Sequence, residues 1–262
     1  MVINLLFSWI ISDLLGHIIL STMRKREHGY NYDGETVFSR VRSDAPGPDD
    51  ETLDREFFVY VMGPYTAFNA ECAYDDADKL RTRFADDPLF DPDEHVTDDG
   101  RGDYEAVLQA FCSQLRERLG VRAFLATDID IPTLDESDGS TPGMAVPRQS
   151  VAFAAVSDAV VFVFTEGGLT TGAGGELGTI LGEFNLAPDD PEQVRKPRER
   201  FCVFQSEGFE SGTIEEIPPA YEIESVPFAN REGLVEATQQ FLVNLKRDHP
   251  DRQLPIYRPY DG

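Results

Sequence analysis

The chain has 262 residues, which is enough for one sizeable α/β domain with tails or for two small domains. It carries 48 acidic and 23 basic residues, a formal net charge of −25, and 41% of its residues are hydrophobic. A chain with this much apolar sequence can bury a core and is not expected to be disordered. The shortage of basic residues excludes a Lys/Arg-rich face, so no nucleic-acid partner is expected.

The acidic composition resembles that of cytosolic proteins from extreme halophiles, because Asp and Glu are in excess, Arg is retained and only four lysines are present. Unpartnered surface carboxylates repel one another in dilute salt, whereas at molar salt the Debye length falls to about 3 Å. We therefore expect a halophilic protein that is more stable in molar than in dilute KCl. Three cysteines without Cys-x-x-Cys spacing favour buried thiols in a reducing cytoplasm, and four scattered histidines predict no metal site.

The amino-terminal residues 1–22 differ from the rest, because residues 2–20 form an apolar run that Arg24-Lys25-Arg26 follow. A secretory signal would carry its positive charge before the run, and Asp13 at mid-span would cost roughly 2.5–3.5 kcal/mol in a membrane. Three interpretations stay open: an over-long start with Met23 as the true first residue, a membrane anchor, or an amphipathic helix packed on the domain. We expect a cytoplasmic protein without a membrane partner, with anchoring by residues 2–20 as the alternative.

The rest of the chain divides into three parts. Residues 23–55 are polar, contain Pro46-Gly47-Pro48 and are predicted to be a flexible lead-in. Residues 56–250 are predicted to form a single α/β nucleotide-binding-like domain, in which the connection 206–220 lacks a helix, and residues 251–262 form a tail. In chain order, the predicted elements are a strand at 57–62, helices at 70–85 and 104–120, a strand at 121–127, a helix at 147–157, a strand at 158–165, a helix at 174–184, strands at 200–205 and 221–228, and a helix at 231–248.

Strands that alternate with helices imply parallel pairing and right-handed crossovers. The fold class is therefore α/β: a doubly wound, flavodoxin-like five-stranded parallel sheet in the order 2-1-3-4-5, flanked by helices. In that order ligands bind outside the carboxyl ends of strands 1 and 3, where the winding direction reverses. Those ends carry the sequences MGPY and TEGGLTTGAGGELG, so we expect the site there.

The glycine-rich stretch TTGAGGELG, residues 170–178, has two remaining explanations. A Walker-type loop would need a Lys that is absent, and a Rossmann fingerprint would follow the first strand rather than the third. Either the bare backbone of Gly172, Gly174 and Gly175 approaches a sugar or phosphate at a helix amino terminus, or the glycines form a turn that only packs. The predicted helix places Glu176 in its first turn, where the macrodipole alone favours a glutamate. A carboxylate in that position would also face the crevice as a nucleophile must.

Three motifs in this order resemble the nucleoside 2-deoxyribosyltransferase family and its relatives: VYVMGPY, then SDAVVFVF, then GGELG. The resemblance spans about residues 57–205. It implies that Glu176 attacks the sugar C1′, forms a glycosyl-enzyme ester and releases the base. It also implies a base-side role for the aromatic residue of the Gly-Pro-aromatic turn, which is Tyr65 here.

The chain departs from the family at two acidic positions, whose counterparts are Thr170 and the stretch 148–150, Arg-Gln-Ser. Glycosidic chemistry normally uses two carboxyl groups. Asp158 begins its strand and should face the opposite edge of the sheet, as a turn residue. Asp128 and Asp130 could supply the second carboxylate or belong to a solvated acidic loop. Arg148 could pair with a phosphate or with Glu176, or lie on the surface.

The predicted function is cleavage or transfer at the N-glycosidic bond of a nucleoside, nucleotide or dinucleotide, by a deoxyribosyltransferase or N-glycoside hydrolase. A non-catalytic nucleotide-sensing or scaffold module with the same fold is the alternative. The expected partner is a small nucleoside or nucleotide ligand, no cofactor is expected, and homo-oligomerisation stays open. Besides the catalytic Glu176, the predicted substrate-binding residues are Gly63, Pro64, Tyr65, Asp128, Arg148, Gly172, Gly174 and Gly175.

Overall fold

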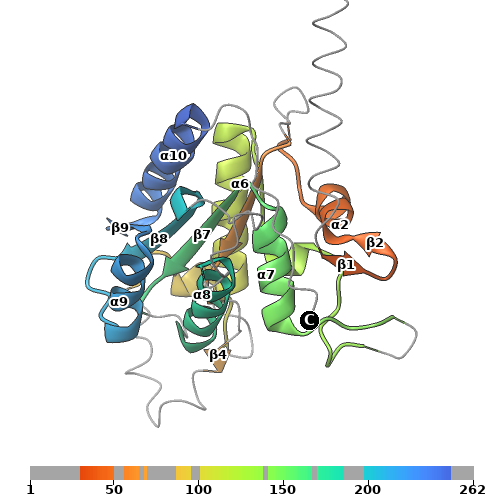
Figure 1. Ribbon diagram of the computed structural model, residues 1–262. Coiled ribbons are helices and arrows are strands. Elements are labelled where there is room, and N and C mark those ends of the chain that lie inside the picture. The colour runs from red at the N-terminus through yellow and green to blue at the C-terminus, as the bar shows by residue number, and fades with distance from the viewer. Residues whose placement is uncertain are drawn as a thin grey trace, which may run out of the picture.

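The computed structural model describes eight stretches of the chain (Figure 1). Residues 1–22, the predicted helix 70–85 and the tail 251–262 lie outside them. No helix in the part of the chain that is described combines the length and the apolar character needed to cross a membrane. The described residues are 30–49, 56–64, 68–69, 87–95, 101–137, 141–166, 170–185 and 198–248.

A five-stranded parallel sheet forms the centre of the domain. Its order is β6-β3-β7-β8-β9, which is 2-1-3-4-5 when these strands are numbered along the chain, so the predicted doubly wound α/β fold is confirmed. All its neighbouring pairs are parallel, as in the pairing of β3 residue Tyr60 with Phe124 on one side and Val160 on the other. The strands are β3 (Phe58–Met62), β6 (Arg122–Phe124), β7 (Ala159–Phe164), β8 (Phe201–Ser206) and β9 (Glu224–Phe228).

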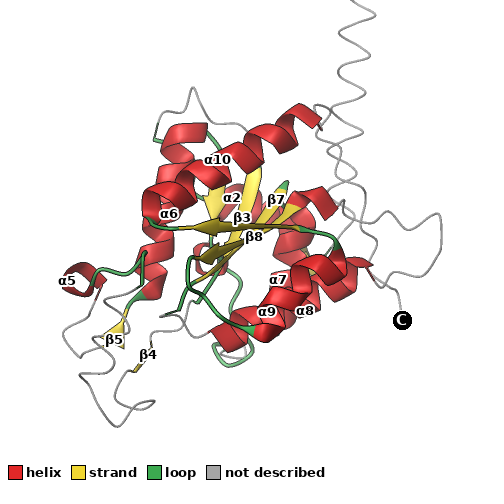
Figure 2. Cartoon of the chain, turned by 90° about the vertical axis from the view of Figure 1, so that its left-hand side faces the viewer, coloured by secondary structure: helices red, strands yellow, loops and turns green. Residues whose placement is uncertain are grey.

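Helices cover both faces of the sheet (Figures 1 and 2). Side chains of a strand alternate between the two faces, so Phe58, Tyr60 and Met62 pack on one side and Val59 and Val61 on the other. Coverage on both sides explains why the predicted strands read as continuous apolar runs. One face carries α6 (Tyr104–Leu119) and α10 (Arg231–Asp248), and the other carries α2 (Val37–Asp44), α7 (Val146–Val156), α8 (Thr170–Asn185) and α9 (Gly212–Tyr221).

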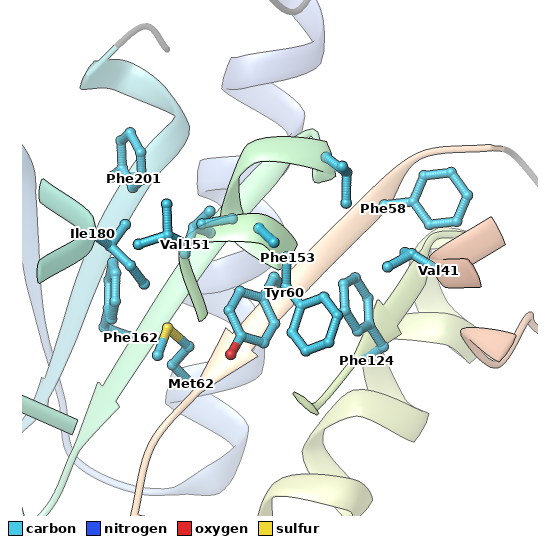
Figure 3. Packing of buried hydrophobic residues seen from close by; sticks show 14 of the residues in the cluster. Val41, Phe58, Tyr60, Met62, Phe124, Val151, Phe153, Phe162, Ile180 and Phe201 are labelled. Carbon is cyan, nitrogen blue, oxygen red and sulfur yellow. The ribbon is translucent and has the colours of Figure 1, made fainter. Parts of the chain in front are cut away.

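Aromatic rings fill the core beneath α7 (Figure 3). The Tyr60 ring stacks on Phe124 at 5.3 Å between centroids and meets Phe153 of α7 edge-on at 5.6 Å. Such pairs hold β3, β6 and α7 in a fixed arrangement at the edge where the candidate site lies. The shorter elements are β1 (Asn31–Tyr32), β2 (Glu35–Thr36), β4 (Phe68–Asn69), α5 (Pro92–His95), β5 (Arg101–Gly102), η2 (Ala126–Asp128) and η3 (Arg198–Arg200).

The prediction of a flexible lead-in at 23–55 is wrong for residues 30–49. They form the β1–β2 hairpin and α2, whose Val37 and Val41 are completely buried. Thr36 caps the helix by accepting a hydrogen bond from the Ser39 amide. The apolar stripe of α2 is narrow and lies among charged residues, so the polar composition of this stretch did not indicate a packed helix. The packed domain therefore includes residues well before 56.

The prediction of a helix-poor connection at 206–220 is also wrong, because α9 occupies Gly212–Tyr221. Pro218 and Pro219 lie inside this helix and each removes a backbone donor, which normally ends a helix. Buried Ile214 and partly buried Ile217 attach α9 to the core, so tertiary packing outweighs the local preference. The predicted buried thiols are present at Cys112 and Cys202, while Cys72 lies outside the described residues.

Candidate functional site

A pocket of about 930 Å³ opens at the carboxyl ends of β3 and β6. Its walls come from the end of β3, the loop after β6, the amino-terminal half of α7 and the first turns of α8. This is the edge at which a doubly wound sheet binds its ligands. The described residues that line it are Tyr60, Gly63, Pro64, Ala126, Thr127, Asp128, Ile129, Asp130, Ile131, Pro132, Thr133, Glu136, Val146, Gln149, Ser150, Ala173 and Glu176.

Gly63 and Pro64 end β3 and line the pocket, as predicted for the first strand end. A Cβ atom on Gly63 would lie 2.9 Å from a methyl carbon of Leu108 and 3.3 Å from the carbonyl oxygen of Val163. The glycine is therefore needed for close packing of β3 against α6 and β7. Tyr65 lies outside the described residues, so its base-side role stays a prediction.

Asp128 lines the pocket, but both of its carboxylate oxygens accept hydrogen bonds from the protein. Oδ2 accepts from the Leu125 amide at 2.7 Å, and Oδ1 accepts from Nε2 of Gln109 at 2.7 Å. These bonds fix the turn that follows β6. The neighbouring Asp130 is exposed, and its backbone amide donates to Asp44. Asp128 therefore acts as a structural acceptor in the pocket wall.

Gln149 holds the outer wall of the pocket and was not singled out as a site residue. Its Nε2 donates to the carbonyl oxygens of Ile131 at 2.8 Å and Pro132 at 3.1 Å, so α7 anchors the loop after β6. That loop returns to the domain at Gly143, where a Cβ would lie only 2.3 Å from the carbonyl oxygen of Thr133. Only glycine fits this approach. The sequence carries no signal for these long-range contacts.

The helix that carries Glu176 begins at Thr170, four residues earlier than predicted. The predicted place of Glu176 in the first turn is therefore wrong, and no acidic residue lies in that turn. Dipole effects fade within the first turn, so they do not account for a glutamate at this position. Gly174 lies in the second turn of α8 and lets it approach α9 so closely that a Cβ would lie 2.9 Å from Ile214.

The Glu176 side chain lines the pocket beside Ser150 of α7. Burial raises the pKa of its carboxyl from 4.5 to about 7, and a hydrogen bond with the Ser150 hydroxyl opposes that shift. Ser150 is itself buried, and its Oγ donates to the Val146 carbonyl oxygen at 3.1 Å. Within the described part of the chain, no cation forms an ion pair with Glu176.

The remaining predicted residues do not converge on the pocket. Arg148 is exposed and does not line it. Burial and the Glu183 carboxylate raise the pKa of Tyr30, and the Arg148 guanidinium opposes that shift, so Arg148 acts on the α2 side of α7. Gly174 packs against α9, and Gly175 is exposed with open space where a side chain would be. Gly172 belongs to the first turn of α8, whose surroundings lie outside the description.

Residues 40–258 match the model of a family described as Domain of unknown function (DUF7509). The chain belongs to this family. No curated protein and no solved structure gives a significant match.

The charges in the pocket are all of one sign among the described residues. Asp128, Asp130, Glu136 and Glu176 line it, and no Lys, Arg or His does. The described residues also contain no group of acidic, His or Cys side chains that could hold a metal ion. The pocket therefore offers one carboxyl that titrates near neutral pH, an apolar wall and an acidic rim.

Proposed function

We propose that the protein cleaves or transfers the N-glycosidic bond of a nucleoside-like ligand, with Glu176 as the nucleophile. The observation that supports this most strongly is the place of Glu176. It is a partly buried carboxyl without a cationic partner among the described residues, and it faces a pocket at the sheet edge where doubly wound folds bind ligands. Burial raises the pKa of this carboxyl to about 7, and a perturbed carboxyl in a cleft is typical of a functional site.

The size and the apolar wall of the pocket support this proposal. Its volume of about 930 Å³ lies within the range typical of small-ligand sites. The apolar wall formed by Tyr60, Ile131 and Val146 can bind a flat base. The Glu176 carboxylate attacks C1′ of the sugar, the C1′–N bond breaks and its electron pair leaves with the base. Water or an acceptor base then attacks C1′ and releases the carboxylate.

One observation favours a second candidate, a nucleoside-binding module without catalysis. Glycosidic chemistry normally employs two carboxyl groups in different roles. The neighbouring carboxyl of Asp128 is already engaged, because its two oxygens accept hydrogen bonds from Leu125 and Gln109. In this alternative, Glu176 binds the ligand by hydrogen bonds and forms no ester.

The substitution Glu176→Gln tests the first proposal. We expect the fold to be retained and the release of free base from nucleosides, followed by chromatography, to fall by on the order of 10³-fold or more. Glu183→Gln is the matched control, because Glu183 lies on the same helix but is exposed and outside the pocket. An unchanged rate in Glu176→Gln would refute the nucleophile assignment. Ligand binding without base release in the unsubstituted protein would support the binding module.

A further inference from the structure

The charge of the pocket bears on which ligand enters it. Four carboxyl groups line the pocket, and the described lining residues include no basic side chain. Phosphate recognition relies on Arg or Lys side chains, and the basic residue nearest in sequence, Arg148, is exposed outside the pocket.

An acidic rim beside an apolar wall produces a directional field. Clefts with one sign of charge and low-dielectric walls concentrate ions of the opposite sign. Asp130 and Glu136 are exposed at this rim, and the net charge of the whole chain is −25. The described lining of the pocket therefore favours a cationic ligand over one that carries a phosphate.

The hydrogen bonds in the pocket also limit how a leaving base can depart. Both oxygens of Asp128 accept hydrogen bonds from the protein. Glu136 accepts from the amide and hydroxyl of Thr133, which lowers the pKa of its carboxyl and keeps it ionised. With Glu176 acting as nucleophile, Asp128 and Glu136 are engaged with protein donors, and the remaining described carboxyl of the pocket, Asp130, is exposed at the rim.

A base that departs without protonation must already be a good leaving group. A neutral purine or pyrimidine would leave as an anion, which the acidic pocket disfavours. A pyridinium-type base leaves as a neutral molecule. Before cleavage, the pyridinium ring of the bound ligand is positively charged. That charge near Glu176 favours the ionised carboxyl and opposes the effect of burial, so binding of the ligand would generate the nucleophile.

Building on the proposed function, we propose that the site selects N-glycosides whose base is a cationic heteroaromatic ring and whose sugar carries no phosphate. In the reaction, a Glu176 oxygen forms a bond to C1′, and the electron pair of the broken C1′–N bond neutralises the ring nitrogen. Water then hydrolyses the ester, which restores the carboxylate and releases one proton.

Binding measured by calorimetry with the Glu176→Gln protein separates selection from cleavage. The probes are nicotinamide riboside, its uncharged dihydro form and its 5′-phosphate. We expect nicotinamide riboside to bind at least about tenfold more tightly than either comparison ligand at low salt, with the preference shrinking as KCl is added. Equal or tighter binding of the uncharged form or the phosphate would overturn the inference.

Rim variants provide the matched comparison. The double substitution Asp130→Asn with Glu136→Gln removes two exposed charges and should reduce the cation preference, whereas Arg148→Ala should leave it unchanged. A preference that survives in the double variant would contradict the electrostatic explanation.

Cleavage assays on the unsubstituted protein distinguish this inference from the proposed function. Release of base from nicotinamide riboside, at a kcat/KM at least about tenfold above that of inosine and uridine, supports both. Comparable cleavage of the neutral nucleosides keeps the proposed function and overturns the selection. Selective binding of the cation without any cleavage keeps the selection and refutes the nucleophile.

Discussion

Asp158, which is buried, and Glu176, which is partly buried, are carboxyl groups near opposite edges of the same sheet, and their surroundings differ in charge. Asp158 directly precedes β7 at the amino edge and is completely buried. Its Oδ2 accepts from the Phe58 amide at 2.8 Å, and Nη1 of Arg200 lies 4.0 Å from Oδ1. The same Nη1 donates to the Asp158 carbonyl oxygen at 2.8 Å. The fold thus supplies a donor and a buried cation for this carboxylate.

Glu176 at the carboxyl edge has the hydroxyl of Ser150 and, within the described residues, no cationic partner. A buried charge without compensation is costly, so its carboxyl titrates near neutral pH. The comparison indicates that the amino edge uses its carboxylate to hold the sheet together. At the edge formed by the carboxyl ends of the strands, Glu176 has no cationic partner among the described residues, and under our proposal a bound ligand supplies one. The two edges should therefore respond differently to the same isosteric substitution.

The largest effect is expected for Asp158→Asn. The amide can still accept the Phe58 hydrogen bond, but the buried Arg200 guanidinium loses the negative charge 4.0 Å away. Removing one partner of a buried pair costs about 3–5 kcal/mol. Urea denaturation should show this loss in the free energy of unfolding. A loss below about 1 kcal/mol would show that Arg200 does not depend on Asp158.

The opposite sign is expected for Glu176→Gln. A carboxyl whose pKa is raised on folding makes the folded state bind more protons, so the unsubstituted protein loses stability as pH rises from 4.5 to about 7 and changes little above that. The neutral amide lacks this loss. The variant should match the unsubstituted protein near pH 4 and exceed it by about 3 kcal/mol at pH 8, because the pKa rises from 4.5 to about 7 and each pKa unit corresponds to roughly 1.4 kcal/mol. Urea denaturation at both pH values measures the difference, and equal stability at pH 8 would contradict the burial of an unpaired carboxyl.

Sequence patterns predicted the sheet because continuous apolar runs such as β3 and β7 occur only where helices cover both faces. They also placed Asp158 at the opposite edge, since that follows from its position before a strand. The Arg200 partner was missed because it lies 42 residues away and pairing across neighbouring strands leaves no local pattern. The helix α2 was missed for another reason: it is short, and its three buried residues, Val37, Phe38 and Val41, lie in a polar stretch.

For the site, the rule that ligands bind at the carboxyl ends of strands correctly brought Gly63, Pro64, Asp128 and Glu176 to one pocket. The same rule did not predict the position of Arg148, which lies outside the pocket. The register of the helix, rather than its place in the fold, decides which face such a residue occupies. The hydrogen bonds that occupy Asp128 and orient Glu176 depend on side-chain geometry, which sequence does not specify. The chemistry that these residues perform stays a prediction.

The smallest expected effect concerns Ser150 and sharpens the comparison most directly. Its hydroxyl has a single proton. In the structure it donates to the Val146 carbonyl oxygen, and it can turn instead to the ionised carboxylate of Glu176. Ser150→Ala removes the one described hydrogen bond that lowers the pKa of Glu176, so that pKa should rise by roughly half a unit to one unit.

Carbon-13 NMR titration of labelled glutamate side chains measures this shift directly, and Ser157→Ala is the matched control. Ser157 follows the same helix and donates to the Phe153 carbonyl oxygen at 2.7 Å, but it lies at the far end of α7 from the pocket. Its loss should lower stability and leave the Glu176 titration where it was. Ser150→Thr keeps the hydroxyl and should restore the original titration. A Glu176 pKa that stays constant or falls in Ser150→Ala would mean that another group orients this carboxyl, and the contrast with Asp158 would then lose its physical basis.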